Sequence, residues 1–160
     1  MIKRRNGKTP PKVGEGKRGA EGYLGHLLRQ AAHAYRKRAD TALSGLEITP
    51  PQFSVMTMLT AYPGQSSADI ARLALLTPQT VSVIVANLEK RGALARRPHP
   101  VHGRVQTLEL TESGRTLLAA ARKRMRRLDR ELSADMTTEE EQAVRRWLVR
   151  VAVEAEDAGS

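Results

Sequence analysis

The chain has 160 residues, a formal net charge of +10 and no cysteine, which excludes disulfides, thiolate catalysis and cysteine-based zinc sites. Hydrophobic residues make up 40% of it but aromatic ones only 3%, so we expect a core of Leu, Val, Ala, Ile and Met. No apolar run reaches the roughly 18 residues of a membrane span, and the N-terminus lacks the apolar segment of a signal peptide, so we predict a cytoplasmic protein with no membrane partner.

Charge is distributed unevenly along the chain. Residues 1–130 carry a net charge of +15, whereas residues 131–160 carry −5. Such asymmetry is typical of a protein in which the larger, basic part contacts nucleic acid and the acidic C-terminal part does not. Residues 1–20 hold seven basic residues, four Gly and two Pro, so we predict a disordered basic arm that either touches DNA or only adds solubility.

Two helices are expected to follow the arm. From Tyr23 onward, apolar residues recur every three or four positions, which predicts a long helix with one apolar stripe. A second helix starts at Thr49, which can cap it, with Pro50 at the first helical position and Gln52 completing a capping box. This helix runs to about Ala61 and is apolar on every side, so we predict that it is buried.

A helix-turn-helix pair is predicted next. Ser66 caps a short third helix, and Thr77 caps a fourth, which has Pro78 at its first position. Gly92 stands where a helix commonly ends. The residues expected to face inward are Ile70, Leu73 and Ala74 on the third helix and Val81, Ile84, Val85 and Leu88 on the fourth.

A hairpin and two long helices complete the chain. The hairpin has expected strands near 93–97 and 104–110, joined by a loop at 98–103. Thr111 caps a fifth helix with a nearly heptad apolar seam, and Thr137 starts a sixth with one apolar side. The lobe is too small to cover this seam, so we predict a homodimer. The seam is Leu117, Ala121, Met125, Leu128 and Leu132; the apolar side is Val144, Trp147, Leu148 and Val151.

These elements predict a mostly α fold with a small β-hairpin wing, built as a winged helix-turn-helix lobe plus a helical dimerisation domain. We assign residues 1–20 to the disordered basic arm, 21–48 and 112–157 to the helical dimerisation region, and 49–111 to the DNA-binding lobe.

Three segments in this order resemble the MarR (multiple antibiotic resistance regulator) family of winged helix-turn-helix transcription factors. They are LEITPPQFSVMTML (46–59), ADIARLALLTPQTVSVIVANLEKRGALARR (68–97) and LELTESGRTLL (108–118). The resemblance implies an obligate homodimer whose two winged lobes lie on a pseudo-palindromic operator. It also implies that a small, often phenolic or anionic, ligand releases the DNA.

The chain departs from the family pattern at two places. Relatives often carry an acidic residue and an Asp-Arg-Arg run at the wing tip, but here His99, His102 and Gly103 occupy those positions and only Arg104 persists. An Asp–Arg pair therefore cannot form there as usual. On the fourth helix, Val83 stands where many relatives have arginine.

The outward side of the fourth helix is expected to read DNA. Gln79 and Asn87 can pair bidentately with adenine, and serine or threonine hydroxyls bond either bases or phosphates. Val83 either meets a thymine methyl group or is an ordinary exposed apolar residue. The residues expected to contact DNA are Ser67, Thr77, Gln79, Thr80, Ser82, Val83, Asn87, Lys90, Arg97, His102 and Arg104.

Further cations and the two wing histidines allow more than one interpretation. Arg96, Arg97 and Arg104 are predicted wing cations that hold the register on DNA. Lys90 and Arg91 either bind phosphate or complement the negative end of the helix dipole.

His99 and His102 could bind a metal or sense pH, but polar contacts to the DNA backbone are favoured because no further His or Cys lies nearby. No metal site is therefore predicted. The six cations between residues 122 and 130 are interpreted as a solvated helix face.

An effector pocket is a weaker expectation. Apolar walls could come from Phe53 and Met56, and polar groups from Tyr35 and Arg38, although Met56 is most simply a core residue. Arg38 could pair with an anionic ligand, but an aliphatic stem lying along the core is the favoured interpretation.

The combined prediction is a homodimeric, sequence-specific DNA-binding transcriptional regulator, with repression favoured over activation and a small anionic or phenolic effector. The alternative is an architectural, nucleoid-type DNA binder with little sequence specificity. A protein-interaction module would leave the charge of the body unexplained. An enzyme is not expected, because the chain has no nucleophile motif, no Gly-rich phosphate loop and no credible metal set, and no cofactor is predicted.

Overall fold

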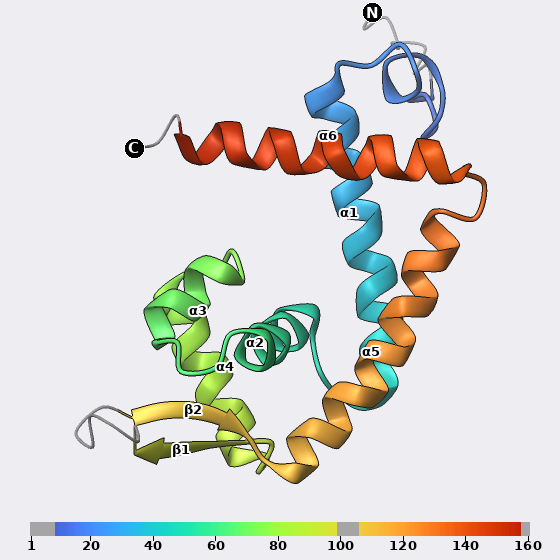
Figure 1. The fold of residues 1–160 in the computed structure, drawn as a ribbon. Helices are drawn as coiled ribbons and strands as arrows, with labels where there is room; N and C mark the ends of the chain where they lie inside the picture. The colour runs from blue at the N-terminus through green and yellow to red at the C-terminus, as the bar shows by residue number, and fades with distance from the viewer. Residues whose placement is uncertain (1–8, 99–105, 158–160) are drawn as a thin grey trace, which may run out of the picture. The chain divides into compact units, whose positions relative to one another are not determined.

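A computed structural model of the chain describes residues 9–98 and 106–157 (Figure 1). The chain divides into two compact units, Met1–Thr41 and Ala42–Ser160. Most of the long helix α1 (Leu24–Leu43) belongs to the first unit, and the winged lobe belongs to the second.

The described part of the N-terminal arm has local structure. A short 3-10 helix, Gly16–Arg18, precedes α1, and the carbonyl of Arg18 accepts a hydrogen bond from Gln30 Nε2 at 3.0 Å. Turns and side-chain bonds to α1 thus accompany part of this segment, and the disorder of the arm stays a prediction. The rest of the arm lies outside the described residues.

The start of α2 (Pro50–Ala61) confirms the predicted capping box. Gln52 N donates to Thr49 Oγ1 at 3.4 Å, and Thr49 N donates to Gln52 Oε1 at 2.9 Å, so two backbone donors are satisfied reciprocally. Val55, Met56 and Leu59 are buried and Phe53 is half-buried. The apolar helix is therefore in the core of the lobe, as predicted.

The helices α3 (Ser67–Leu73) and α4 (Pro78–Lys90) form the predicted helix-turn-helix pair. On α3, Ile70 and Ala71 are buried, but Leu73 is 38% exposed, so the prediction that Leu73 faces inward is wrong. At 3.6 residues per turn, Leu73 points about 110° away from the middle of the face that Ile70 and Ala71 share.

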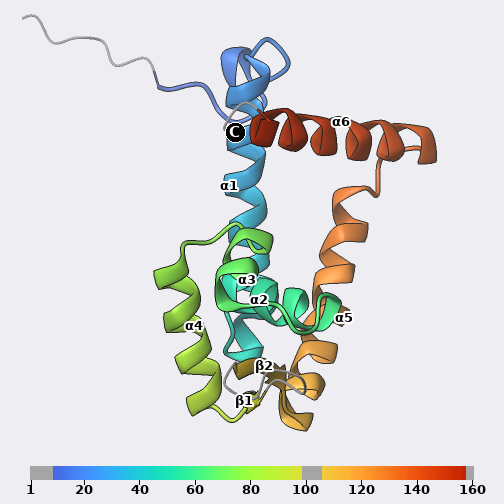
Figure 2. The same cartoon turned by 60° about the vertical axis from the view of Figure 1, so that its left-hand side comes forward.

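The inward side of α4 is confirmed and forms the centre of the lobe. Figure 2 shows α2 and α3 above the antiparallel hairpin β1 (Leu94–Pro98) and β2 (Gln106–Leu110), with α4 running down on the left to the level of the strands. In the hairpin, Leu94 pairs with Leu110. These elements share one hydrophobic core. Its members from α4 and the hairpin are Val81, Ile84, Val85, Leu88, Leu94, Leu108 and Leu110, none of them more than 9% exposed.

The first turn of α5 (Glu112–Leu132) is fastened to the base of the hairpin. Thr111 Oγ1 and Ser113 Oγ donate to the Gly92 carbonyl at 2.6 and 2.9 Å. Gly114 packs so closely that an added Cβ would lie 1.9 Å from the Ala93 carbonyl oxygen. The backbones of α5 and the hairpin therefore meet at a point where a side chain has no room.

The seam of α5 differs in part from the prediction. Ala121, Met125 and Leu128 are buried, but Leu118 replaces Leu117 as the buried leucine of the first turns. Leu118 enters the core of the lobe, whereas Leu117 only packs against its edge. The predicted last seam residue, Leu132, is 42% exposed because it is the final residue of the helix.

The C-terminal helix α6 (Thr138–Asp157) begins at the predicted cap. Thr137 Oγ1 accepts from Glu140 N at 3.2 Å, while Glu140 Oε2 accepts from Thr137 N at 2.8 Å. Its predicted apolar side is partly open to solvent, with Val144 40% and Leu148 43% exposed, whereas Trp147 and Val151 are half-buried. In the described part of the chain no single helix is long and apolar enough to cross a membrane, and only α3 and α4 together, bent by 109°, reach that composition.

Candidate nucleic-acid interface

The turn of the helix-turn-helix pair is tight and strained. Leu76 N donates to the Ala71 carbonyl at 2.9 Å, which closes the turn after α3. Between them, Leu75 has a φ of +55° in the left-handed region and is 87% exposed. A non-glycine residue rarely adopts this conformation, which costs roughly 1–2 kcal/mol. No sequence pattern indicated Leu75, and only its position just after a helix could have done so.

The outer face of α4 is the most extended set of predicted contacts that the structure brings together. Gln79, Val83, Asn87 and Lys90 are all exposed, and Val83 keeps 61% of its surface accessible. The side-chain amides of Gln79 and Asn87 form no hydrogen bond within residues 9–98 and 106–157, so both amides remain available to another molecule.

The hydroxyl groups of the same helix are partly engaged. Thr77 Oγ1 accepts from Thr80 N at 3.1 Å and lies 2.8 Å from Thr80 Oγ1, which makes Thr77 the N-cap of α4. Ser82 Oγ donates to the Pro78 carbonyl at 2.9 Å. Because these hydroxyls already donate or accept locally, they have less capacity for base recognition than the two amides.

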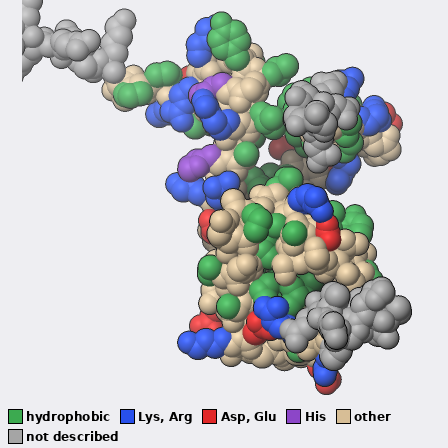
Figure 3. Space-filling model, turned by 90° about the vertical axis from the view of Figure 1, so that its left-hand side faces the viewer, with side chains coloured by type: hydrophobic (Ala, Val, Ile, Leu, Met, Phe, Trp, Pro, Cys, Tyr) green, Lys and Arg blue, Asp and Glu red, His purple; other side chains and the backbone are tan. Residues whose placement is uncertain are grey.

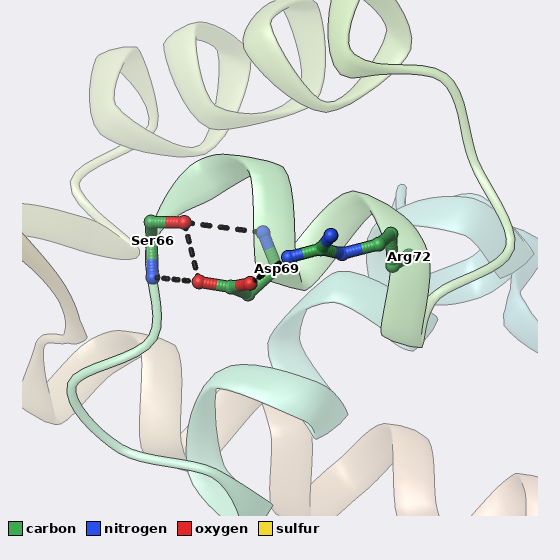
Figure 4. A network of polar contacts seen from close by, with 3 residues as sticks. All are labelled: Ser66, Asp69 and Arg72. Atoms are coloured by element: carbon green, nitrogen blue, oxygen red, sulfur yellow. Dashed lines mark hydrogen bonds and ion pairs between the residues drawn. The ribbon is translucent and has the colours of Figure 1, made fainter.

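A polar network surrounds the start of α3, next to the exposed Ser67 (Figure 4). Asp69 accepts from the Ser66 hydroxyl at 2.5 Å and from Ser66 N at 3.2 Å, and it forms an ion pair with Arg72. The Ser66 hydroxyl, followed by Arg72, lowers the pKa of the Asp69 carboxyl below its usual value of 3.8. The charge of Arg72 is therefore balanced within α3.

Among the predicted wing cations, Arg96 and Arg97 differ in their surroundings. Arg96 Nε donates to Glu89 Oε1 of α4 at 2.9 Å, whereas Arg97 is exposed and forms no ion pair among the described residues. Alternation along the strand explains the difference, because Arg96 shares the face of the buried Leu94 and Arg97 lies on the opposite face. The predicted contacts His102 and Arg104, together with His99, lie outside the described residues.

Arg91 has a structural role that the sequence did not indicate. Its guanidinium donates to the carbonyls of Leu46 at 2.9 Å and Glu47 at 2.6 Å, from a position directly after α4. Both carbonyls belong to the connection around the 3-10 helix η2 (Ser44–Leu46) that leads to α2. The bonds span more than forty residues of sequence, so no local pattern could predict them.

The other described basic residues of the second unit do not form one continuous patch on the face drawn in Figure 3. Figure 3 shows Lys and Arg side chains scattered over the visible face of the lobe, several of them beside acidic ones. In the predicted solvated face of α5, Arg127 pairs with Glu131 at 2.9 Å, but Arg124 is half-buried and donates to the Ala42 carbonyl at 3.1 Å. Arg124 therefore departs from that interpretation.

The predicted effector residues are divided between the two units. Tyr35 and Arg38 lie on α1 in the first unit, while Phe53 and Met56 lie on α2 in the second. Met56 is fully buried in the core, and Phe53 packs against that core. Within the described residues, no group of three or more His, Asp or Glu side chains could hold a metal ion.

Comparison with known proteins points to one family. A sequence model described as MarR family matches residues 46–105. The HTH-type transcriptional repressor Rv2887 of Mycobacterium tuberculosis is 35% identical over 128 residues, which cover 80% of this chain and 92% of the repressor.

Two solved structures extend this similarity to the fold. The transcriptional repressor CouR bound to a 23-mer DNA duplex has a TM-score of 0.76 and 28% identity, covering 90% of this chain and 99% of CouR. Rv2887 in complex with salicylic acid has a TM-score of 0.68 and 34% identity, covering 82% of this chain and 98% of that one. The arrangement of α2 to α5 around the hairpin is therefore a winged helix of known type.

Proposed function

The chain belongs to the MarR family of transcriptional regulators, and we propose that it represses transcription by binding a pseudo-palindromic operator as a homodimer. It would do so in the cytoplasm, with one α4 helix in each of two successive major grooves. Two such helices fit half-sites about one helical turn apart, roughly 10 base pairs. The hairpins would then grip the flanking phosphates and minor grooves.

The observation that carries this proposal is the outer face of α4. This face presents two uncommitted amides, Gln79 and Asn87, around the exposed apolar Val83. Amides that are free to pair with adenine and an aliphatic group that fits a thymine methyl favour reading of base edges. CouR, which has a similar fold, has been solved bound to a 23-mer DNA duplex, and this supports DNA binding by the present chain.

Homodimerisation is supported by the open apolar side of α6. Val144 and Leu148 on its predicted apolar side are 40% and 43% exposed, and Val149 and Val153 on the opposite side are 63% and 51% exposed, which is costly for a helix that would remain in water. A second copy of the chain would cover these residues. Sedimentation equilibrium at micromolar concentration should give a mass near twice 17.6 kDa, and a monomer mass would overturn this part of the proposal.

Release by a small ligand is the second element of the proposal. Rv2887 has been solved with salicylic acid, which is both phenolic and anionic. We expect this chain to lose its operator when an aromatic carboxylate binds, with Arg38 pairing with the carboxylate and Tyr35 on the same helix beside the ring. The measurement is operator binding during a salicylate titration, and the Arg38→Gln variant should respond more weakly.

The experiment that tests DNA recognition is selection of bound duplexes from a random pool at physiological salt. Enrichment of one inverted repeat would support a dimeric reader of sequence. Binding that depends only on duplex length and salt would overturn it in favour of an architectural DNA binder. The second outcome would also reduce Gln79, Val83 and Asn87 to ordinary surface residues.

A further inference from the structure

One ion pair joins the recognition helix to the wing. Arg96 of β1 donates from Nε to Glu89 Oε1 at 2.9 Å and from Nη2 to Glu89 Oε2 at 3.5 Å. Both side chains are part-exposed, 47% for Arg96 and 29% for Glu89. The guanidinium therefore meets the carboxylate at two points on the surface of the lobe.

The position of Glu89 is unfavourable for the helix itself. It lies in the last turn of α4, where the helix dipole is negative and a carboxylate is destabilising. The neighbouring Lys90 is the type of residue that this end favours. An acid at this position therefore calls for a compensating interaction, and the pair with Arg96 provides it.

The lobe also separates the two cations of β1. The turn at Gly92 and the burial of Leu94 set the strand so that Arg96 faces α4, while Arg97 lies on the opposite face. The strand thus presents one arginine that is available to phosphate and one that is neutralised by the recognition helix.

We propose that Glu89 is a specificity-determining residue: by retaining Arg96, it weakens sequence-independent DNA binding while leaving base recognition by α4 intact. This inference rests on the proposed DNA-binding function. Each arginine that binds phosphate adds to the salt-dependent, non-specific part of the affinity. Withholding one of them increases the ratio of specific to non-specific binding, which decides occupancy among many competing sites.

The test uses the full-length protein and a duplex that lacks the selected operator. Glu89→Gln should bind this duplex several-fold more tightly, and the slope of log affinity against log salt should steepen by about 0.9, the value of one added phosphate contact. Glu109→Gln is the matched control, because Glu109 is an exposed acid on β2 opposite Ala95 and its removal changes the net charge equally. Equal slopes for the two variants would overturn the inference.

A second variant tests the inference by replacing Arg96, the partner of Glu89. Arg96→Gln should keep the wild-type slope, since Arg96 is already neutralised, and Glu89→Gln combined with Arg96→Gln should return to that slope. A slope that falls by about 0.9 in Arg96→Gln alone would show that Arg96 binds phosphate in the presence of Glu89 and would overturn the inference. Thermal unfolding of each variant checks that the lobe is folded.

Binding of DNA by the wild-type protein distinguishes a failure of the proposed function from a failure of the role of Glu89. Absence of any DNA binding by the wild type would overturn the proposed function together with this inference. Normal binding by the wild type, with the two acid variants indistinguishable, would overturn the role of Glu89 alone.

Discussion

The outer face of α4 and the base of the hairpin are neighbouring surfaces, but the side-chain amides of the first form no hydrogen bond within the described part of the chain, whereas arginines of the second bond to the protein. On α4, Gln79 and Asn87 are free of internal hydrogen bonds within the described residues. At the hairpin base, Arg91 and Arg96 are both bonded to the protein itself. The difference shows that the charge of this chain overstates the charge available to DNA, because part of it stabilises the lobe.

The largest expected effect is a loss of stability when the close packing at the base of the hairpin is disrupted. Gly114→Ala should destabilise the lobe by about 2–3 kcal/mol, because the new methyl group would overlap the Ala93 carbonyl and force the backbones apart. Thermal unfolding measures the loss. Gly25→Ala is the control, since its Cβ would meet no atom within 4 Å and alanine favours the helix. Equal stability of Gly114→Ala and the wild type would contradict the close packing.

Removal of the Arg91 side chain separates internal bonding from phosphate binding. Arg91→Ala should cost about 1–3 kcal/mol of stability, because the Leu46 and Glu47 carbonyls lose a charged donor. The salt dependence of DNA binding should stay at the wild-type slope. Lys90→Ala provides the contrast, with a slope lower by about 0.9 if Lys90 binds phosphate. A lower slope in Arg91→Ala would reassign Arg91 to the DNA.

Truncation of side chains on the outer face of α4 should weaken base recognition and leave the stability of the protein unchanged. Asn87→Ala should lose about 1–3 kcal/mol of discrimination at one base pair, because the amide pairs bidentately with adenine. Competition between the selected operator and single-base variants measures it, and thermal unfolding should not change. Val83→Ala should act in the same way at a thymine position, but more weakly. Unchanged base preference in both variants would remove this face from the interface.

The turn that leads into α4 offers a stabilising change. Leu75→Gly should raise stability by about 1 kcal/mol, because glycine adopts the φ of +55° without strain and Leu75 buries little surface. Chemical denaturation gives the free energy. Leu75→Ala is the control, since alanine keeps the strain and should gain nothing. A loss of stability in Leu75→Gly would mean that the exposed leucine makes a contact in the dimer.

The smallest expected effect is the pH dependence of the α3 network. The pKa of Asp69 is lowered in the folded protein, so its stabilisation is complete above the unfolded value and is lost as pH falls through the lower, folded value. The stability difference between the wild type and Asp69→Asn should therefore be full at pH 7 and shrink below about pH 3.8. Denaturant titrations at several pH values measure it. A difference that does not change with pH would contradict the ion pair with Arg72.

Local signals in the sequence determined where most helices begin and which side of α4 is buried. The caps at Thr49, Ser66, Thr77 and Thr111 bond to backbone groups within three residues, so the information lies within one helical turn. The inward side of α4 follows from its 3.6-residue period, and the resulting outward side contains most of the candidate DNA contacts.

Tertiary structure alone decided which cations the protein retains for itself. The bonds of Arg91 to Leu46 and Glu47 join residues more than forty positions apart, and the pair of Arg96 with Glu89 depends on the angle at which β1 leaves α4. The burial of Leu118 in place of Leu117 likewise depends on the direction from which the lobe meets α5. Hydrogen bonds and ion pairs require specific distances between elements, and those distances exist only once the core has brought the elements together.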